Sequence, residues 1–370
     1  MRLFKHPLLV GSMKLALGDH HSMLLRTDGS VWSTSISFYG VISASNGVNN
    51  RFTQVIPTGA TAIAAGTGFS MVLKKDGSVW ATGRNYRGQL GDGTRVRKDT
   101  FFCVQTFIGV KAVAAGGYHS LILTDEGDIS STGSNKYGQL ADGTSKVERS
   151  RFRNAMSTGA KAMAAGELHS IVLKQDGSVW AAGRNQNGQL GDGSKTDRRS
   201  FVQAMPDGAV AVAAGGFHSM VLKQDGSVWT TGWNKYGQLG DGVTIDRNYY
   251  AKVIPSGAKR IAAGKRHSMV LKQGGSLWAT GYNKHGQLGT GSTIDSKVFL
   301  PVMSEGVKIA AAGAHHSMAL KLDDSVWATG SNEDGQFGDG STANKEIFAR
   351  ISPFGDGLDD SMHIYVSSYP

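Results

Sequence analysis

The sequence is poor in cysteine and proline and has no long apolar run. Of its 370 residues only one is a cysteine, Cys103, and seven are prolines. A single thiol excludes an internal disulfide, so a disulfide-stapled secreted scaffold is excluded and a reducing compartment is the simpler expectation. Seven prolines are too few for a disordered low-complexity chain. No window approaches the ~20 apolar residues of a membrane helix. The apolar run after Met1 is short and is followed by Lys14. We therefore expect no signal peptide, no membrane contact and a cytoplasmic location, with a nuclear one as the alternative.

Common catalytic signatures are also missing. There is no G-x-S-x-G nucleophile turn and no phosphate-binding loop, and Cys103 has no neighbouring base. Aspartates recur in G-D-G turns, where we expect their side chains to bond turn amides instead of forming a carboxylate array. We predict no chemistry of the chain's own, no cofactor and no metal.

Glycine is abundant, with 51 residues, and it marks a repeat. A G-x-x-H-S motif, an apolar strand, a D-G pair, a strand containing Trp and an N-x-x-G-Q-L-G motif recur about every 49–50 residues. A fixed period favours one repeat-built domain over residues 1–354, followed by a non-repeat tail over 355–370. The anchoring glycines are Gly18, Gly66, Gly116, Gly166, Gly215, Gly264 and Gly313.

Each repeat predicts four short strands, the fourth of which contains Phe or Tyr. The D-G pair predicts a type I′ hairpin turn, which needs positive φ at both central residues, and Asp323-Asp324 is the least suitable copy. Single blades cannot bury their apolar faces, whereas radial closure buries them all. We predict an all-β, seven-bladed β-propeller with four antiparallel strands per blade. It should be closed by the N- and C-terminal segments, with the segments around Phe4 and Phe348 meeting in one blade.

Six repeats share a histidine and six share a tryptophan at fixed positions. A metal-binding histidine ring would need imidazoles within about 4 Å of one ion, and equivalent positions on neighbouring blades are usually farther apart. Phe69 and Ile129 interrupt the two series. We predict that the histidines bond backbone between inner strands and that the tryptophans pack blade against blade. These structural residues are His21, His119, His169, His218, His267 and His316, and Trp32, Trp80, Trp180, Trp229, Trp278 and Trp327.

The net charge of +10 is concentrated after the G-D-G turns. Equivalent loops of a repeat protein lie on one face, so a basic crescent is expected. A solvated rim is the simpler interpretation, and a site for an acidic protein, a histone or nucleic acid is the alternative. The clusters lack the interleaved aromatics of a nucleic-acid site. The rim residues are Arg95, Arg97, Lys98, Lys146, Arg149, Arg151, Arg153, Lys195, Arg198 and Arg199.

The two residues inside each G-x-x-H motif vary between otherwise similar repeats. A repeat scaffold displays its function at positions that packing leaves free, and these loops should surround the mouth of the central channel. Exposed Tyr, Phe, Leu and Arg together are typical of a protein interface. The predicted partner-binding residues are Asp19, His20, Tyr118, Glu167, Leu168, Phe217, Lys265, Arg266 and His315.

The motifs G-x-x-H-S, D-G-x-V-W-x-x-G and N-x-x-G-Q-L-G-D-G resemble the repeats of the regulator of chromosome condensation family over roughly residues 14–354. The resemblance implies a seven-bladed propeller. Similar propellers include exchange factors for a nuclear Ras-like GTPase, ubiquitin-ligase accessory domains, a plant ultraviolet-B receptor and a secreted β-lactamase inhibitor, so fold alone decides little. In the receptor and the inhibitor this motif position carries interface aromatics and arginines, which the resemblance transfers to Tyr118, Phe217 and Arg266.

The exchange-factor pattern is only partly present. In that family member, acids on two neighbouring repeats and a histidine of these loops act on the GTPase. Asp19 matches one of the acids and His315 matches the histidine type. The neighbouring repeat, however, has Gly68 and no second acid, and His315 lies only one blade away from Asp19. The first repeat, at 32–42, departs from N-x-x-G-Q-L-G much as the exchange factor's own irregular repeat does. We predict a monomeric, non-catalytic protein-interaction platform. The alternatives are exchange on a Ran-type small GTPase, a ubiquitin-ligase accessory or substrate-binding domain, and an inhibitor.

Overall fold

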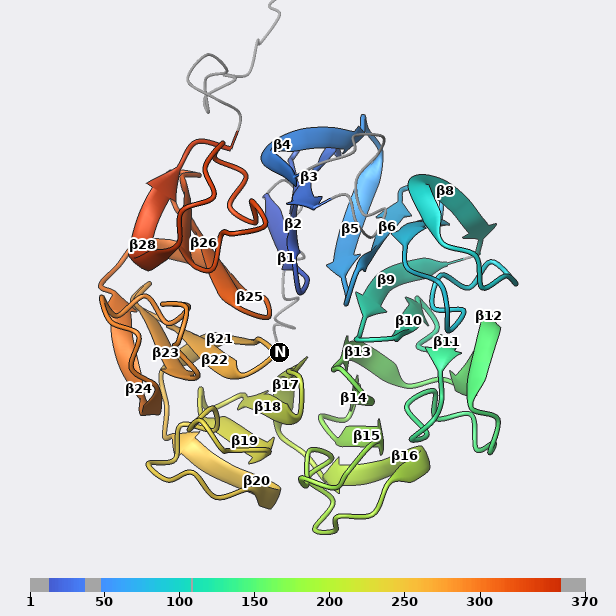
Figure 1. Ribbon diagram of the computed structural model, residues 1–370. Helices are drawn as coiled ribbons and strands as arrows, with labels where there is room; N and C mark the ends of the chain where they lie inside the picture. Colours follow the sequence, from blue (N-terminus) through green and yellow to red (C-terminus); the bar gives the residue numbers. More distant parts are fainter. Residues whose placement is uncertain (1–12, 37–47, 108, 354–370) are drawn as a thin grey trace, which may run out of the picture.

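Seven four-stranded antiparallel sheets stand as blades around a central channel in the computed structural model (Figure 1). The structure describes residues 13–36, 48–107 and 109–353, whose regular elements are all β-strands. In every blade the spatial order of the strands is their order in the chain. The predicted all-β fold with seven blades is confirmed. Within the described ranges no helix could cross a membrane.

The strands follow the repeat closely. Blades 1 to 3 contain β1 (Lys14–Leu17), β2 (His21–Leu25), β3 (Val31–Ile36) and β4 (Val48–Ile56); β5 (Ala60–Ala65), β6 (Phe69–Lys74), β7 (Ser78–Gly83) and β8 (Lys98–Thr106); β9 (Val110–Ala115), β10 (His119–Thr124), β11 (Ile129–Ser134) and β12 (Glu148–Met156). Blades 4 and 5 contain β13 (Ala160–Ala165), β14 (His169–Lys174), β15 (Val179–Gly183) and β16 (Arg198–Met205); β17 (Ala209–Ala214), β18 (His218–Lys223), β19 (Val228–Gly232) and β20 (Arg247–Ile254). Blades 6 and 7 contain β21 (Ala258–Ala263), β22 (His267–Lys272), β23 (Leu277–Gly281) and β24 (Ser296–Met303); β25 (Val307–Ala312), β26 (His316–Lys321), β27 (Val326–Gly330) and β28 (Lys345–Ile351).

The register of the strands places two kinds of loop on one face. In blade 5, His218 at the start of β18 pairs with Gly232 at the end of β19, whereas Leu222 pairs with Val228 beside the hairpin turn. The G-x-x-H loop and the N-x-x-G-Q-L-G loop therefore lie at the same end of each blade. We call this end of the propeller the G-x-x-H face and the opposite end, with the D-G turns, the hairpin face.

The predicted type I′ turn at the D-G pairs is wrong. Only the glycine has positive φ, 82° at Gly177, and the preceding aspartate is not in the left-handed region. Gly177 donates to the Lys174 carbonyl at 3.1 Å and Lys174 donates to that of Ser178 at 2.9 Å, so the loop has three residues and ends in a left-handed glycine. Asp176 accepts from the Ser178 amide and hydroxyl, which explains its recurrence. In the last blade Asp324 takes the glycine's place with φ of 60°.

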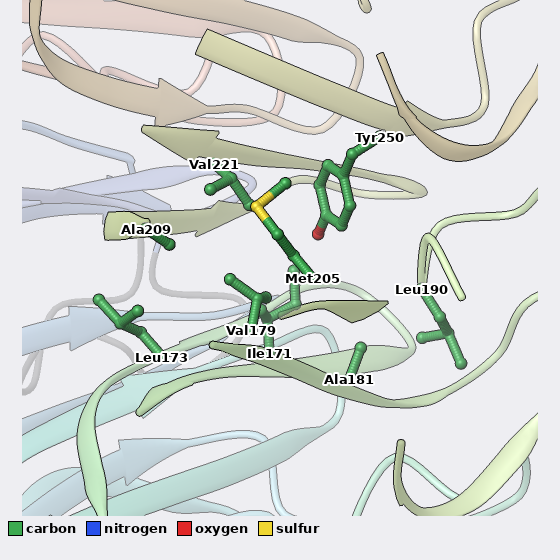
Figure 2. Packing of buried hydrophobic residues seen from close by; sticks show 9 residues of the cluster. All are labelled: Ile171, Leu173, Val179, Ala181, Leu190, Met205, Ala209, Val221 and Tyr250. Atoms are coloured by element: carbon green, nitrogen blue, oxygen red, sulfur yellow. The ribbon is translucent and has the colours of Figure 1, made fainter. Parts of the chain in front are cut away.

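The core lies between blades. Figure 2 shows Ile171, Leu173 and Val179 of blade 4 facing Val221 and Tyr250 of blade 5. All five side chains are buried. Burying an aliphatic side chain of this size contributes about 1.5–3 kcal/mol. Because each blade supplies one apolar face to each neighbour, the ring is stable only when it is closed.

Ring closure joins blades 1 and 7 by contacts of the same kind. The Phe52 amide donates to the Gly338 carbonyl at 3.3 Å, and Leu24 packs with Met318. A Cβ on Gly338 would lie 2.3 Å from the Phe52 ring, so this turn needs glycine. Phe348 lies in β28, which pairs with β27 and completes blade 7 from four consecutive strands. The segment around Phe4, residues 37–42 of the irregular repeat and the tail over 355–370 are outside the described residues.

Candidate partner-binding face

The repeated histidines connect each blade to the next one. The Nε2 atom of His218 lies 2.9 Å from the hydroxyl of Ser268 in blade 6, and this hydroxyl donates to the backbone carbonyl of Gln238 in blade 5 at 2.7 Å. The hydroxyl proton is thus used, so the imidazole must be the donor at Nε2. The histidine's observed partner is a serine hydroxyl of the neighbouring blade and not the backbone we expected. The histidine–serine pairs are His21–Ser70, His119–Ser170, His169–Ser219, His218–Ser268, His267–Ser317 and His316–Ser22.

These imidazoles are neutral and completely buried. Burial lowers the pKa of His119 to about 4 and that of His218 to about 3. Each ring also lies against an anchoring glycine, since a Cβ on Gly215 would be 2.2 Å from Cε1 of His218. Among the residues that the structure describes, no group of three or more His, Cys, Asp or Glu is placed to hold a metal.

The repeated tryptophans lie toward the hairpin face. Trp229 donates from Nε1 to the Ser227 hydroxyl at 2.9 Å, packs against the apolar cluster of blade 4 and lies under the ammonium of Lys223, 5.2 Å from its ring centroid. In blade 3, where Ile129 replaces the tryptophan, Thr124 stands where the other blades carry this lysine or Arg26. The cation and the ring are thus replaced together.

Three predicted partner-binding residues meet across the channel mouth. The ammonium of Lys265 in blade 6 lies 3.0 Å from Asp19 of blade 1 and 3.6 Å from Glu167 of blade 4. Burial raises the pKa of the Glu167 carboxyl, and the charge of Lys265 opposes that rise. Burial alone would lower the pKa of Lys265, but the two carboxylates raise it. Lys265 offsets part of the negative charge of the two carboxylates at the end of a narrow channel lined by small residues.

Three other predicted loop residues, His20, Tyr118 and Leu168, lie outside the continuous group of aromatic rings on the G-x-x-H face. His20 bonds Asp334 of blade 7 at 2.7 Å, and this hydrogen bond raises the pKa of His20. Tyr118 and Leu168 are half-buried, and none of the ring contacts found in the described ranges includes Tyr118.

Phe217, Arg266 and His315 belong to a continuous group of rings and guanidinium groups. The ring of Phe217 lies edge to face with Trp233 at 5.9 Å, and Trp233 with Tyr236 at 5.3 Å. Tyr236 contacts Tyr282 at 4.8 Å, and Tyr282 lies 6.2 Å from His315. We call the whole group the aromatic arc; it comprises Tyr137, Arg184, Phe217, Trp233, Tyr236, Arg266, Tyr282, His285 and His315.

Two arginines are inserted between these rings. The guanidinium carbon of Arg266 lies 5.6 Å from the ring centroids of both Tyr236 and Tyr282, and that of Arg184 lies 5.1 Å from Phe217. Cation–π contacts of this kind contribute about 0.5–1 kcal/mol each at exposed sites. Both arginines are half-buried. The arc therefore holds its own charged groups in place on the G-x-x-H face.

The sequence indicated only part of the arc. Trp233, Tyr236 and Tyr282 lie in the N-x-x-G-Q-L-G loops, outside the G-x-x-H window that we considered. The Trp233 amide donates to the Phe217 carbonyl at 2.8 Å, so the two variable positions are neighbours. The signal was the same in both loops: one position differs between repeats that are otherwise similar. The residue after each third-strand glycine varies as Arg84, Ser134, Arg184, Trp233, Tyr282 and Ser331.

The basic rim follows the third strands of blades 2, 3 and 4 and therefore lies toward the G-x-x-H face. Several of its charges are already paired within the rim. Arg149 contacts Asp142 at 2.7 Å, Arg198 contacts Asp192 at 2.8 Å and Arg95 contacts Glu148. The aspartates of these turns also bond backbone, as Asp192 does to the Ser194 amide. Arg97 contacts Asp99, and Lys98 contacts Asp92. Arg199 donates to the Thr144 carbonyl. No ion pair is found among the described residues for the remaining four rim residues, which are Lys146, Arg151, Arg153 and Lys195.

Fold and site together define a closed propeller. Repeated contacts join its blades, and variable side chains are displayed on its G-x-x-H face. The sequence model of the RCC1-like domain matches residues 5–256, and models of the regulator of chromosome condensation (RCC1) repeat match residues 258–287, 307–336 and 274–320. The chain therefore belongs to the regulator of chromosome condensation repeat family.

Solved structures share this architecture. Human WBSCR16 aligns with a TM-score of 0.77 at 24% identity, over 89% of this chain and 95% of that one. Prp20p from Saccharomyces cerevisiae, described together with its binding to Gsp1p and histones, aligns with a TM-score of 0.73 at 24% identity, over 84% and 82%. Yeast RCC1 (Prp20) bound to Kap60 aligns with a TM-score of 0.76 at 19% identity, over 93% and 85%. Identities this low show the fold alone. No curated protein sequence matches significantly.

Proposed function

We propose that the protein is a non-catalytic platform that binds a protein partner through the aromatic arc on its G-x-x-H face. The observation that carries this proposal is the arc itself, a continuous set of half-buried rings and arginines across five adjacent blades. Trp, Tyr and Arg are the residues that contribute most to binding energy at protein interfaces, often about 2 kcal/mol or more each.

The scaffold favours tight binding because little has to be ordered when a partner docks. Immobilising a side chain at an interface costs about 0.5–1.5 kcal/mol. Trp233 and Tyr236 already contact each other and Arg266, and their loops are fixed by the Trp233–Phe217 backbone hydrogen bond. Most of the groups offered by the arc are aromatic rings and guanidinium groups, which are typical of binding surfaces.

Exchange on a small GTPase is an outcome to be tested and not a second proposal. The likeness to Prp20p supports the fold only. Asp19, the acid that the exchange hypothesis needs, is paired with Lys265, and the equivalent loop of blade 2, Thr67-Gly68, has no acid. Binding of histones or nucleic acid through the unpaired rim residues has no support beyond their charge.

The test is affinity capture from native lysate with the wild-type chain and with an arc variant carrying Phe217→Ala, Trp233→Ala and Tyr282→Ala. The matched control is Lys272→Ala, which removes a cation that lies 3.8 Å from the ring of Trp278 on the hairpin face. We expect the wild-type chain and the control to capture the same protein and the arc variant to lose it. The thermal midpoint of each variant confirms that it is folded.

Three results would argue against the proposal. Equal capture by the arc variant would place the interface elsewhere. A Ras-like GTPase bound only without nucleotide, and released on adding GTP, would identify an exchange factor, which holds the empty form better than the loaded one. Salt-sensitive capture of nucleic acid or histones by wild type and variant alike would assign binding to the basic rim.

A further inference from the structure

The arc contains charged donors that the protein itself does not satisfy. Lys265 and Arg266 are adjacent in the chain, and both are half-buried, but only Lys265 is paired, with Asp19 and Glu167. Within the described part of the chain the Arg266 guanidinium lies against three aromatic rings and makes no hydrogen bond or ion pair, whereas the Arg266 backbone carbonyl accepts from the Tyr282 amide. On the other side of Phe217, the Arg184 guanidinium donates from a terminal nitrogen to the Gln186 side chain at 3.0 Å, but its buried Nε has no acceptor.

Both half-buried guanidinium groups therefore keep N–H donors that have no acceptor among the described residues. Arginine presents five N–H donors in a planar fork that fits a planar anion in two parallel hydrogen bonds. Burial against rings removes water from part of this fork, so an acceptor supplied by a partner recovers hydrogen bonds that solvent cannot provide fully. Arg266 and Arg184 stand on either side of the Phe217–Trp233 pair, which provides an apolar surface between the two donors.

We propose that the arc binds a partner segment in which two acidic side chains flank an apolar one. The carboxylates pair with Arg184 and Arg266, and the apolar side chain packs on Phe217 and Trp233. This inference rests on the proposed function and adds the chemistry of the partner. Charge complementarity identifies the occupant, because neither guanidinium is ion-paired among the described residues and the acids of the channel mouth, Asp19 and Glu167, contact Lys265 instead.

The ring geometry favours a carboxylate over the phosphate of a nucleic acid. Single-stranded nucleic acids stack successive bases on open ring faces. In the arc the rings meet edge to face, with interplanar angles of 88° for Phe217–Trp233 and 82° for Trp233–Tyr236. Arg266 lies over Trp233, Tyr236 and Tyr282, so their faces are partly covered by a guanidinium.

The test selects binders from a random library of short phage-displayed peptides on the purified full-length chain. The reversal variant carries Arg184→Glu and Arg266→Glu, and the matched control is Lys272→Glu on the hairpin face. Wild type and control should enrich peptides with acidic residues on both sides of an apolar one, and the reversal variant should enrich Lys or Arg at these positions. A peptide from the wild-type selection should bind the Arg266→Met variant about thirtyfold more weakly or worse.

The outcomes separate this inference from the function on which it rests. Peptides without acidic bias that bind wild type and reversal variant equally would overturn the inference. If such peptides still lost binding to the Phe217→Ala, Trp233→Ala, Tyr282→Ala variant, the platform function would stand. Failure to enrich any peptide that depends on these three rings would count against both. Tighter binding of single-stranded oligouridylate than of any peptide, lost in the reversal variant, would identify phosphate as the anion and also overturn the inference.

Discussion

Phe217 and His218 are consecutive residues that represent two different regions of the propeller. His218 belongs to the inner ring, where the same histidine–serine contact joins six pairs of blades and every imidazole is buried. Phe217 belongs to the arc, where neighbouring blades carry different residues and the side chains are half-buried. His218 thus occupies a position that is under the same constraint in six of the seven blades, whereas closure of the ring leaves the preceding position, Phe217, free to vary.

The difference shows where stability and recognition are encoded. Positions that face a neighbouring blade must satisfy the same geometry at each joint, so they repeat. Positions that face solvent at the mouth of the channel have no such requirement. Mutations should therefore affect stability in the inner ring and binding in the arc, and the following predictions test this separation from the largest expected effect on stability to the smallest.

Acid should destabilise the protein through its inner ring. The unfolded histidines titrate near pH 6.5, whereas burial lowers the folded pKa of His169 to about 3 and that of His21 to about 4. The unfolded state then binds more protons below about pH 6.5, so stability is complete above that pH and declines toward about pH 4, by up to about 1.4 kcal/mol per pH unit for each histidine. Denaturant midpoints at about pH 7, 6 and 5 measure this decline. A flat profile over this window would contradict it, since carboxylates titrate at lower pH.

His218→Ala should lower the free energy of unfolding by about 1–3 kcal/mol, because it opens a cavity and removes the donor to the Ser268 hydroxyl. The matched control is His285→Ala, at a half-buried histidine of the arc, which should change stability by less than about 0.5 kcal/mol. Guanidinium denaturation of both variants is the measurement. Equal effects of the two substitutions would remove the distinction between the inner ring and the arc.

Phe69→His should destabilise the joint between blades 2 and 3, where the histidine series is interrupted, by only about 1 kcal/mol. The Ser120 hydroxyl already donates to the Gln89 carbonyl and can accept from an imidazole in the place of Phe69. This hydrogen bond contributes about 0.5–1.5 kcal/mol and offsets part of the apolar burial of Phe69, which is worth about 1.5–3 kcal/mol. The reference is Phe69→Ala, which cannot form the bond and should cost about 3–5 kcal/mol. Equal losses of the two variants in guanidinium denaturation would show that this joint cannot accept the histidine–serine contact.

Replacing Tyr118, Phe217 and Arg266 together by Ala should have the smallest effect on stability. Changes at loop positions away from the core usually cost within about ±0.5 kcal/mol each, so the thermal midpoint should move by only a few degrees while partner capture is lost. The measurement pairs a melting curve with the capture assay. A large fall in the midpoint would place these residues in the core and remove the interface they are proposed to form.

The sequence predicted the fold nearly completely because blade geometry is local and repeated. The glycine spacing, the four strands and the face shared by equivalent loops all follow from one unit. The turn type was wrong because Asp176 occurs for its bonds to Ser178 and not for positive φ. The serine partners of the histidines and the arc residues Trp233 and Tyr282 come from a neighbouring blade or a different loop, and no pattern within one motif contains them.

Closure of the ring has a topological consequence. The joint between blades 1 and 7 contains the His316–Ser22 contact, the glycine–aromatic packing at Gly338 and a shared apolar cluster, as do the joints between blades 4 and 5, 5 and 6, and 6 and 7. No strand among the described residues is exchanged across it. This closing joint therefore has the same chemistry as those three joints, which the chain crosses covalently. A circular permutant with new ends between any two blades would keep all the contacts described here, so the order of the blades around the circle, and not the place where the chain is cut, defines this molecule.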